Sequence, residues 1–185
     1  MAPSASNPGS KPEVPPLEPV DAQSAMDRVR AIVFSLAKEE DQATASTPEK
    51  GWGVRLVSAM ELLEASAQPV GRSVFRFTVK PEHCNGLNNL HGGCTATIFD
   101  WLTTSALGPI ARPGYWLYAG VSRTLNVTYL RPVPVGTTVI IDSTVVHAGK
   151  RLCTLASTMK RESDGALLAI CEHGKVSIDP EVTKI

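Results

Sequence analysis

Apolar side chains recur along the chain at two spacings, and each spacing predicts its own kind of element. Within 22–40 they recur every three or four residues, which predicts an amphipathic helix packed on the edge of the domain. Six later segments alternate between apolar and polar residues, which predicts strands. These segments are 54–65, 71–80, 116–129, 137–147, 152–161 and 167–178, with a turn at Gln68-Pro69 between the first two.

A longer apolar run follows the second predicted strand and predicts a central helix. The pair Gly92 and Gly93 opens this run, and Gly108-Pro109 is expected to end the helix. Two strands, one helix and then several antiparallel strands make an α+β order. Turn residues separate the later strands at Pro132-Val-Pro134, Ala148-Gly149-Lys150 and Ser163-Asp164-Gly165.

The central helix carries one carboxylate, Asp100, and no other Asp, Glu, Lys or Arg lies between Glu82 and Arg112. A charged side chain among apolar neighbours is costly unless it is paired or used in chemistry. At the start of the same helix, backbone N–H groups have no partner within the helix and can bind developing negative charge. One segment therefore offers an oxyanion binder and a base, although Asp100 could instead be a structural carboxylate tied to Thr104 or to a surface arginine.

The spacing of these two groups favours a site shared by two chains. A helix rises about 1.5 Å per residue, so Gly92 and Asp100 lie roughly 12 Å apart along its axis, too far for one carbonyl to touch both. His91 falls on roughly the opposite side of the helix from Asp100, which disfavours a His–Asp pair within one chain. A second helix packed antiparallel across a two-fold axis would join the two groups, so a catalytic site here requires at least a dimer.

Three motifs, in this order along the chain, resemble those of one known family. The turn Asn85-Gly-Leu-Asn-Asn-Leu-His91-Gly92-Gly93, then Asp100, then Ser122 ahead of Leu125-Asn126-Val127-Thr128-Tyr129 are similar to those of the hotdog-fold acyl-CoA thioesterases. The likeness runs from about residue 54 to residue 178, and it is to the branch with acyl-CoA thioesterase 13 and the phenylacetate-pathway thioesterases. It implies a hotdog fold, in which a curved antiparallel sheet wraps one long central helix, here with an extra N-terminal helix.

The same resemblance implies hydrolysis of acyl-CoA thioesters, with a role for each motif residue. Asp100 would activate water, or would itself attack the carbonyl carbon as a nucleophile. The Gly92 N–H would polarise the thioester carbonyl across the dimer interface. Asn85 would contact the carbonyl or the water, although it could simply cap its loop.

Other residues near the motif have plainer interpretations beside the functional ones. Ser122 would position the water by resemblance, or it is an ordinary strand serine; no base lies at neighbouring helix or strand spacing to make it a triad nucleophile. His91 is expected to orient the turn by hydrogen bonding, and Gly93 to lie against the substrate or only to permit the tight turn. Cys94 could have a lowered thiol pKa, although a small core residue is the better interpretation.

Coenzyme A carries three phosphate groups, so basic side chains are expected at the mouth of its pocket. Lys150 and Arg151 lie in a predicted turn. Arg123 directly follows Ser122, and Arg131 precedes a proline turn. These four residues are the candidates for binding the substrate's phosphates.

The composition limits the binding partners and the cellular compartment that we expect for this protein. The 18 basic and 18 acidic residues balance, so neither nucleic acid nor an anionic membrane surface is expected as a partner. The four cysteines form no C-x-x-C pair and no zinc-ligand spacing, so we expect no disulfide, no metal and no cofactor. No apolar run approaches the roughly 20 residues that span a bilayer, and no signal-peptide pattern opens the chain. We therefore expect a cytoplasmic protein without stable membrane insertion, with a mitochondrial location as the alternative.

The chain is expected to have three parts. These are a disordered Pro/Ser-rich arm at 1–21, the N-terminal helix and a linker at 22–50, and a hotdog thioesterase domain at 51–180. The domain is expected to form a homodimer that assembles further into a homotetramer. Two other functions stay open: a hydratase acting on enoyl or hydroxyacyl thioesters, which would need an Asp–His dyad in one site, and a protein that binds acyl-CoA without turnover.

Overall fold

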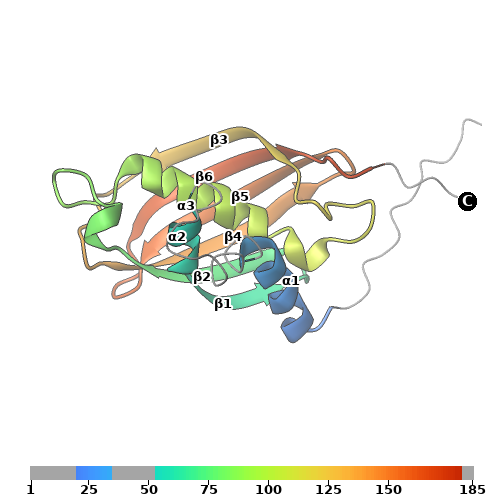
Figure 1. Ribbon diagram of the computed structural model, residues 1–185, viewed down its shortest axis with the longest axis horizontal. Helices are drawn as coiled ribbons and strands as arrows, with labels where there is room; N and C mark the ends of the chain where they lie inside the picture. Colours follow the sequence, from blue (N-terminus) through green and yellow to red (C-terminus); the bar gives the residue numbers. More distant parts are fainter. Residues whose placement is uncertain (1–19, 35–52, 181–185) are drawn as a thin grey trace, which may run out of the picture.

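A computed structural model of the chain describes residues 20–34 and 53–180, which include one curved antiparallel sheet around a central helix (Figure 1). Six strands pair in the order β1-β2-β4-β5-β6-β3. The central helix, α3, spans Gly92–Ser105. The hotdog fold implied by the resemblance is therefore confirmed. The strands are β1 Glu61–Ser66, β2 Arg72–Thr78, β3 Val121–Tyr129, β4 Thr138–Ala148, β5 Leu152–Arg161 and β6 Leu167–Val176.

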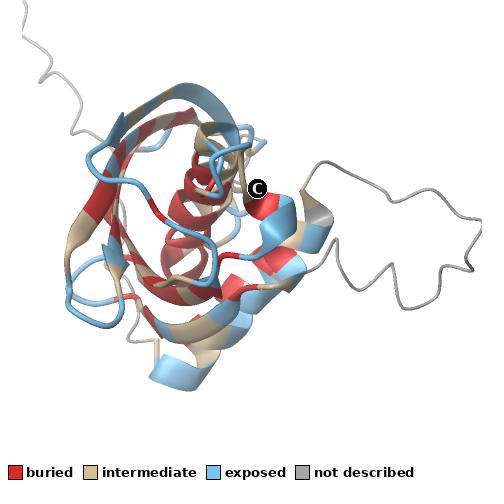
Figure 2. Cartoon of the chain, turned by 90° about the vertical axis from the view of Figure 1, so that its left-hand side faces the viewer, coloured by how far each residue is buried: buried red, intermediate tan, exposed pale blue. Residues whose placement is uncertain are grey.

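The core lies between α3 and the concave face of the sheet, where the buried residues gather (Figure 2). On α3, the side chains of Ile98, Phe99 and Leu102 are fully buried, and their spacing puts them on one face of the helix. They pack in one cluster with Phe75 and Ile141 from the sheet. Burial of each such side chain stabilises the fold by roughly 1.5–3 kcal/mol. This packing fixes the rotation of α3 and therefore the direction in which its polar residues emerge.

The predicted edge helix is confirmed over α1, Ala22–Phe34. Its apolar stripe of Ala25, Val29 and Val33 is at most 1% exposed. The helix contacts β1 and the short helix η3, Gly108–Ile110, which follows the end of α3. The predicted continuation of the helix to residue 40, the linker to residue 50 and residues 1–19 of the arm lie outside the described residues.

The strand predicted over 54–65 is wrong in its first half. Val54–Ser58 forms a short helix, α2, and β1 begins only after it. Gly53 has φ 78°, a left-handed conformation at the helix start, and its carbonyl accepts a hydrogen bond from Val57 N. Val57 and Met60 are both buried, and their three-residue separation suits a helical turn rather than an alternating strand.

The strand predicted over 116–129 also begins later than expected. Trp116 has φ 58° and Ala119 has φ 56°, and an extended strand cannot include such left-handed residues. They form a loop that leads into β3, with the Trp116 side chain fully buried. The other predicted strands and the central helix agree with β2, β4, β5, β6 and α3 to within a few residues.

Candidate active site

The start of α3 is a tight hydrogen-bonded turn. His91 is the N-cap residue, and its Nδ1 accepts a hydrogen bond from Gly93 N at 2.9 Å, the turn-orienting bond expected of it. A Cβ at Gly93 would lie 3.1 Å from the same Nδ1, so the glycine lets the imidazole approach closely. The Gly92 N–H, in contrast, finds no acceptor among the described residues. It is therefore available to a ligand.

A cavity of about 420 Å³ opens beside this turn, with Gly92 and Asn85 on its wall. Asn85 Oδ1 accepts hydrogen bonds from Leu87 N at 2.9 Å and Asn89 N at 3.3 Å. The side-chain oxygen of Asn85 is thus used inside the loop, and its Nδ2 group is left to donate to a ligand. The cavity therefore has two candidate donors for an oxyanion. Its apolar lining includes Leu90, Val133, Met159, Leu168 and Ala169.

Asp100 lies about two turns farther along α3, where the helix meets β3. Ser122 Oγ donates a hydrogen bond to Asp100 Oδ1 at 2.7 Å. The Asp100 side chain is 44% exposed, and its Oδ2 has no hydrogen-bond partner among the described residues. The protein thus holds one carboxylate oxygen and leaves the other open, which suits a base that acts on bound water.

A β-bulge turns Ser122 toward Asp100. The register of β3 against β6 shifts just after Ser122 and leaves Arg123 as the extra residue. At the far end of β3, Tyr129 faces α3 and its hydroxyl donates to Gly92 O at 2.8 Å. Side chains alternate along a regular strand, so Ser122 and Tyr129 would lie on opposite faces without the bulge. The extra residue puts both on the helix side of the sheet.

His173 on β6 is the site residue that the sequence analysis missed. Its Nε2 lies 2.9 Å from Ser122 Oγ and 3.5 Å from Asp100 Oδ1, and its Nδ1 lies 2.6 Å from Thr103 Oγ1. Local spacing gave Ser122 no basic neighbour, and the structure corrects this, because the imidazole comes from a strand 51 residues later. His173 is fully buried. Its one sequence signal is a polar residue at an inward position of an alternating strand.

The hydrogen bonds determine which way the protons of this cluster point. Burial lowers the pKa of His173 to about 4, Lys175 adds to the effect and Asp100 opposes it, so the imidazole is neutral at pH 7. Ser122 donates its only proton to Asp100, so its oxygen accepts from the Nε2–H of His173. Nδ1 is then an acceptor, and the Thr103 hydroxyl shares its one proton between Nδ1 and the backbone oxygen of Phe99, each 2.6 Å from Oγ1. Each hydrogen bond polarises the next one toward the carboxylate.

This arrangement differs from a Ser–His–Asp triad. In a triad, histidine lies between the serine and the acid and removes the serine proton. Here Ser122 lies between the other two, and it receives an N–H from His173 while giving its own proton to Asp100. The cluster therefore orients the Asp100 carboxylate, and it gives Ser122 no histidine base of the triad kind.

Lys175, the next inward residue of β6, puts a buried ammonium group near the same helix. Its side chain is 4% exposed, and its Nζ donates to Thr104 Oγ1 at 3.0 Å. Thr104 in turn donates to the backbone oxygen of Asp100 at 2.7 Å. Burial lowers the pKa of Lys175, and the nearby Asp100 carboxylate acts in the opposite direction. The two charges thus attract each other within the site.

The predicted substrate-binding residues lie in separate places. Gly93 does not line the cavity of Gly92; it lines another, of about 820 Å³, on the α2 side of α3. Arg123 is exposed at the bulge beside Ser122. Lys150 and Arg151 are exposed in the turn between β4 and β5, at the end of the sheet where β3 begins. Arg131 lines the 420 Å³ cavity.

The cysteines are free thiols. Burial raises the pKa of Cys94 to about 11, so the lowered pKa considered for this residue is wrong and its thiol is protonated at pH 7. Over residues 20–34 and 53–180, no group of three or more His, Cys, Asp or Glu side chains could hold a metal ion. No helix in the same two ranges is long and apolar enough to cross a membrane.

The burial of neutral His173 predicts a specific pH dependence of stability. The imidazole binds its proton with a pKa of about 4 in the folded state, against a pKa of 6.5 for an unperturbed histidine. Between these values the unfolded chain binds more protons, so the free energy of unfolding falls as pH drops from 6.5 to 4, by on the order of 3 kcal/mol. His173→Gln removes this part of the slope. Urea unfolding of both proteins across that range measures it, and parallel curves would contradict the assignment.

Comparisons with known proteins agree on the family. Residues 87–168 match the Thioesterase superfamily. Human acyl-coenzyme A thioesterase 13 is 34% identical over 110 residues, which cover 60% of this chain and 75% of the human protein. The crystal structure of zebrafish thioesterase superfamily member 2 matches with a TM-score of 0.65 at 29% identity, over 82% of this chain and 97% of that one. The E. coli PaaI protein from the phenylacetic acid degradation operon shares the fold, with a TM-score of 0.57 at 18% identity over 83% and 92% of the two chains. With its hotdog fold and these relatives, the chain belongs to the thioesterase superfamily.

Proposed function

We propose that this protein hydrolyses acyl-CoA thioesters to a free acid and CoA, with Asp100 as the general base. The observation that carries the proposal is the half-exposed carboxylate of Asp100, one of whose oxygens Ser122 holds at 2.7 Å with buried His173 behind it. The Gly92 N–H adds a donor without an acceptor among the described residues. The names of the relatives supply the substrate class: the human relative is an acyl-coenzyme A thioesterase.

The free edge of β3 supports a site built by two copies of the chain. β3 is the last strand of the sheet, and most of its nine residues are exposed. It contains no proline, and its one charged residue is Arg123 at the bulge. A long edge strand without such protection is a template for pairing with another chain. We propose that two β3 strands pair across a two-fold axis, and that two such dimers assemble into the tetramer.

Contacts within one chain favour the geometry that this pairing needs. One end of β3 touches Asp100 through Ser122, and the other end touches Gly92 through Tyr129. The middle of the strand lies between these contacts. Antiparallel pairing about that middle therefore sets the Ser122 end of one copy against the Tyr129 end of the other. Asp100 of each chain then approaches the Gly92 turn of its partner. The pairing thereby brings together two groups that lie too far apart within one helix to act on the same carbonyl.

The chemistry follows from these positions. The thioester oxygen accepts hydrogen bonds from the Gly92 N–H and from Asn85 Nδ2, which polarise the carbonyl. Asp100 Oδ2 takes a proton from water as the water oxygen bonds to the carbonyl carbon. The tetrahedral oxyanion then collapses, the C–S bond breaks, and the departing sulfur of CoA receives the proton from Asp100. The apolar part of the 420 Å³ cavity receives the acyl group.

A hydratase reaction has less support. Such chemistry needs histidine and aspartate to act together on the substrate, and His173 does lie 3.5 Å from Asp100. The imidazole is fully buried, however, and both of its nitrogens are engaged, with Ser122 and Thr103. It cannot reach a substrate carbon without breaking the cluster. Enoyl-CoA is therefore not expected to be hydrated.

A thiol-release assay tests the proposal directly. Wild-type protein is mixed with short, medium, long and aryl acyl-CoA esters, and free CoA is measured with a thiol reagent. We expect one thiol released for each ester consumed, with the highest kcat/KM for the acyl group that fits the cavity. Thermal stabilisation by these esters without released thiol would contradict the proposal and indicate a binding protein.

A further inference from the structure

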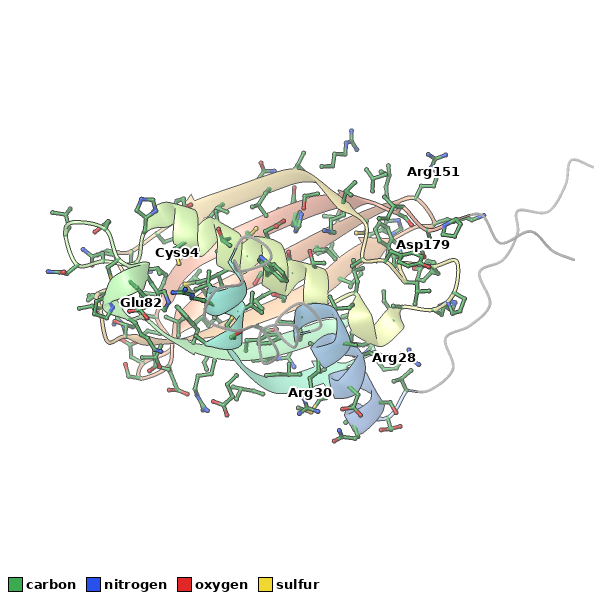
Figure 3. The ribbon with its side chains drawn as sticks, viewed as in Figure 1. Arg28, Arg30, Glu82, Cys94, Arg151 and Asp179 are labelled. Carbon is green, nitrogen blue, oxygen red and sulfur yellow. The ribbon has the colours of Figure 1, made fainter. Side chains whose placement is uncertain are left out.

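Tyr129, the last residue of β3, lies against the glycine pair that opens α3. Its hydroxyl donates to Gly92 O at 2.8 Å, and a Cβ at Gly92 would lie 3.6 Å from Cζ and from Oη of the phenol. Figure 1 shows the end of β3 beside the start of α3. Figure 3 labels Cys94, which directly follows Gly93, toward the opposite end of the molecule from Arg151. The chemistry proposed above assigns no role to this tyrosine.

Tyr129 and His91 hold the two ends of one peptide group. The carbonyl of Gly92 and the N–H of Gly93 belong to the same planar peptide. Tyr129 Oη donates to the oxygen of this peptide at 2.8 Å, and His91 Nδ1 accepts from its N–H at 2.9 Å. A planar group that is bound at both ends cannot rotate without breaking one of the two bonds. The peptide between the glycines is therefore fixed from two sides.

A glycine pair depends on such contacts more than other residues do. Glycine has no Cβ and reaches a wider range of φ and ψ, so the chain at 92–93 is only weakly restrained by its own sterics. Both residues also lie in the first turn of α3, where the N–H groups have no acceptor within the helix. The Gly92 N–H belongs to the preceding peptide, which meets the fixed one at the Gly92 Cα. Its direction is therefore restrained by the fixed peptide.

The sheet anchors the phenol that makes this bond. Tyr129 pairs with Ala169 on β6, and the next residue, Leu130, donates its N–H to Leu168 O at 2.9 Å. Partial burial raises the pKa of Tyr129, so the hydroxyl is protonated at pH 7 and can donate. The side chain is 53% exposed, at the free edge that the proposed dimer would cover. The bond thus joins the edge strand to the start of the central helix.

We propose that Tyr129 is a positioning residue, which holds the Gly92 N–H in the direction that the thioester oxygen requires. This inference rests on the proposed function, because it takes this N–H as a donor to the reacting carbonyl. Tyr129 lines the 420 Å³ cavity beside Gly92 and Asn85, so its bond lies where the ester would bind. The phenol acts through the peptide and does not touch the reacting carbonyl. Donors of this kind act within a narrow range of positions, and a misplacement of about 1 Å can cost a hundredfold in rate.

Steady-state kinetics of Tyr129→Phe are the first test, because this substitution removes one oxygen atom and keeps the ring. We expect kcat for acyl-CoA hydrolysis to fall about tenfold with KM little changed, since a loosened donor weakens binding of the transition state more than binding of the ester. The control is Tyr115→Phe, which breaks a bond of the same kind, from Tyr115 Oη to Ala148 O at 2.9 Å. Its kcat should equal that of the wild type. A wild-type kcat in Tyr129→Phe overturns the proposal, and so does an equal loss in both variants.

The stretching vibration of the thioester carbonyl separates a positioning role from a structural one. Asp100→Asn keeps the bound ester intact, and infrared difference spectroscopy follows its carbonyl through a carbon-13 label. Hydrogen bonds from an oxyanion site polarise the carbonyl and lower its frequency relative to the free ester. We expect this downshift in Asp100→Asn, a smaller one when Tyr129→Phe is added, and an unchanged one when Tyr115→Phe is added instead. An identical band in the two double variants would contradict the proposal.

A double-mutant cycle asks whether Tyr129 and His91 act on the same peptide. The variants are Tyr129→Phe, His91→Ala and the two combined, and thermal melts verify that each one folds. Two contacts that fix one group act as a unit, so the combined loss in kcat should be smaller than the product of the single losses. Losses that multiply would contradict a shared peptide. If the wild type binds the ester but releases no thiol, the proposed function fails, and the carbonyl band still tests the role of Tyr129.

Discussion

Asp100→Asn is expected to lower kcat for acyl-CoA hydrolysis by at least about a hundredfold, with KM little changed. Asparagine has nearly the same shape, and its Oδ1 can still accept the hydrogen bond that Ser122 makes at 2.7 Å. It cannot take a proton from water, so the variant isolates the base. Steady-state thiol release over a range of ester concentrations measures both constants. Near-native turnover would remove Asp100 from the mechanism.

Asp142→Asn is the matched control for this substitution. Asp142 is a partly exposed aspartate, with 36% of its side chain accessible, but it lies on β4 in an ion pair with Arg72. Its loss removes one surface ion pair and should leave kcat unchanged. Single turnover in oxygen-18 water then asks which atom attacks. Label only in the released acid fits activated water, while label entering the Asp100 carboxylate would indicate a mixed anhydride instead.

Two inactive chains should restore activity when they form a mixed dimer. The first chain carries Asp100→Asn, and the second carries Asn85→Asp. The second substitution keeps an Oδ1 acceptor for Leu87 N and Asn89 N but removes the amide donor, so it should cost about a hundredfold in kcat. In the mixed dimer, one site combines the intact Asp100 of the second chain with the intact Asn85 of the first. About half of the wild-type kcat per dimer is therefore expected.

The experiment needs a purified mixed dimer, which two different affinity tags provide. The controls are the two homodimers, each of which should stay at about one percent of wild-type activity or lower. A site built within one chain gives the opposite result, because each chain of the mixed dimer would then carry one defect. Activity no higher than the mean of the two homodimers would contradict the shared site.

The sequence was most informative where function depends on neighbours along the chain. Asn85, His91, Gly92 and Asp100 belong to one turn and one helix, and the structure gives them the loop, cap and helix positions that local rules predict. The two errors of secondary structure are local conflicts. Around Val57 the apolar pattern fits a helix as well as a strand. At Trp116, burial of the side chain holds the backbone in a left-handed conformation that a tryptophan disfavours.

What could not be predicted depends on pairing across the sheet. His173 meets Ser122 across 51 residues and Thr103 across 70, and only the register of β3 on β6 and the packing of α3 bring them together. The direction of Ser122 depends on the bulge at Arg123, and a one-residue irregularity has no periodicity to detect. The sequence does mark two buried residues of β6 near Ser122, because His173 and Lys175 are polar residues at inward positions of that strand.

The bulge at Arg123 divides β3 into two parts, and inward and outward side chains alternate separately within each part. The first part contacts the Asp100 carboxylate through Ser122, and the rest of the strand pairs with β6 and forms the outer edge of the sheet. Deletion of Arg123 would leave a regular ladder in which Ser122 still pairs with Lys175 and Thr124 with Gly174, so the Ser122 hydroxyl would stay on the helix side of the sheet. The strand could thus have gained or lost this one residue by the insertion or deletion of a single codon, with the contact between Ser122 and Asp100 kept.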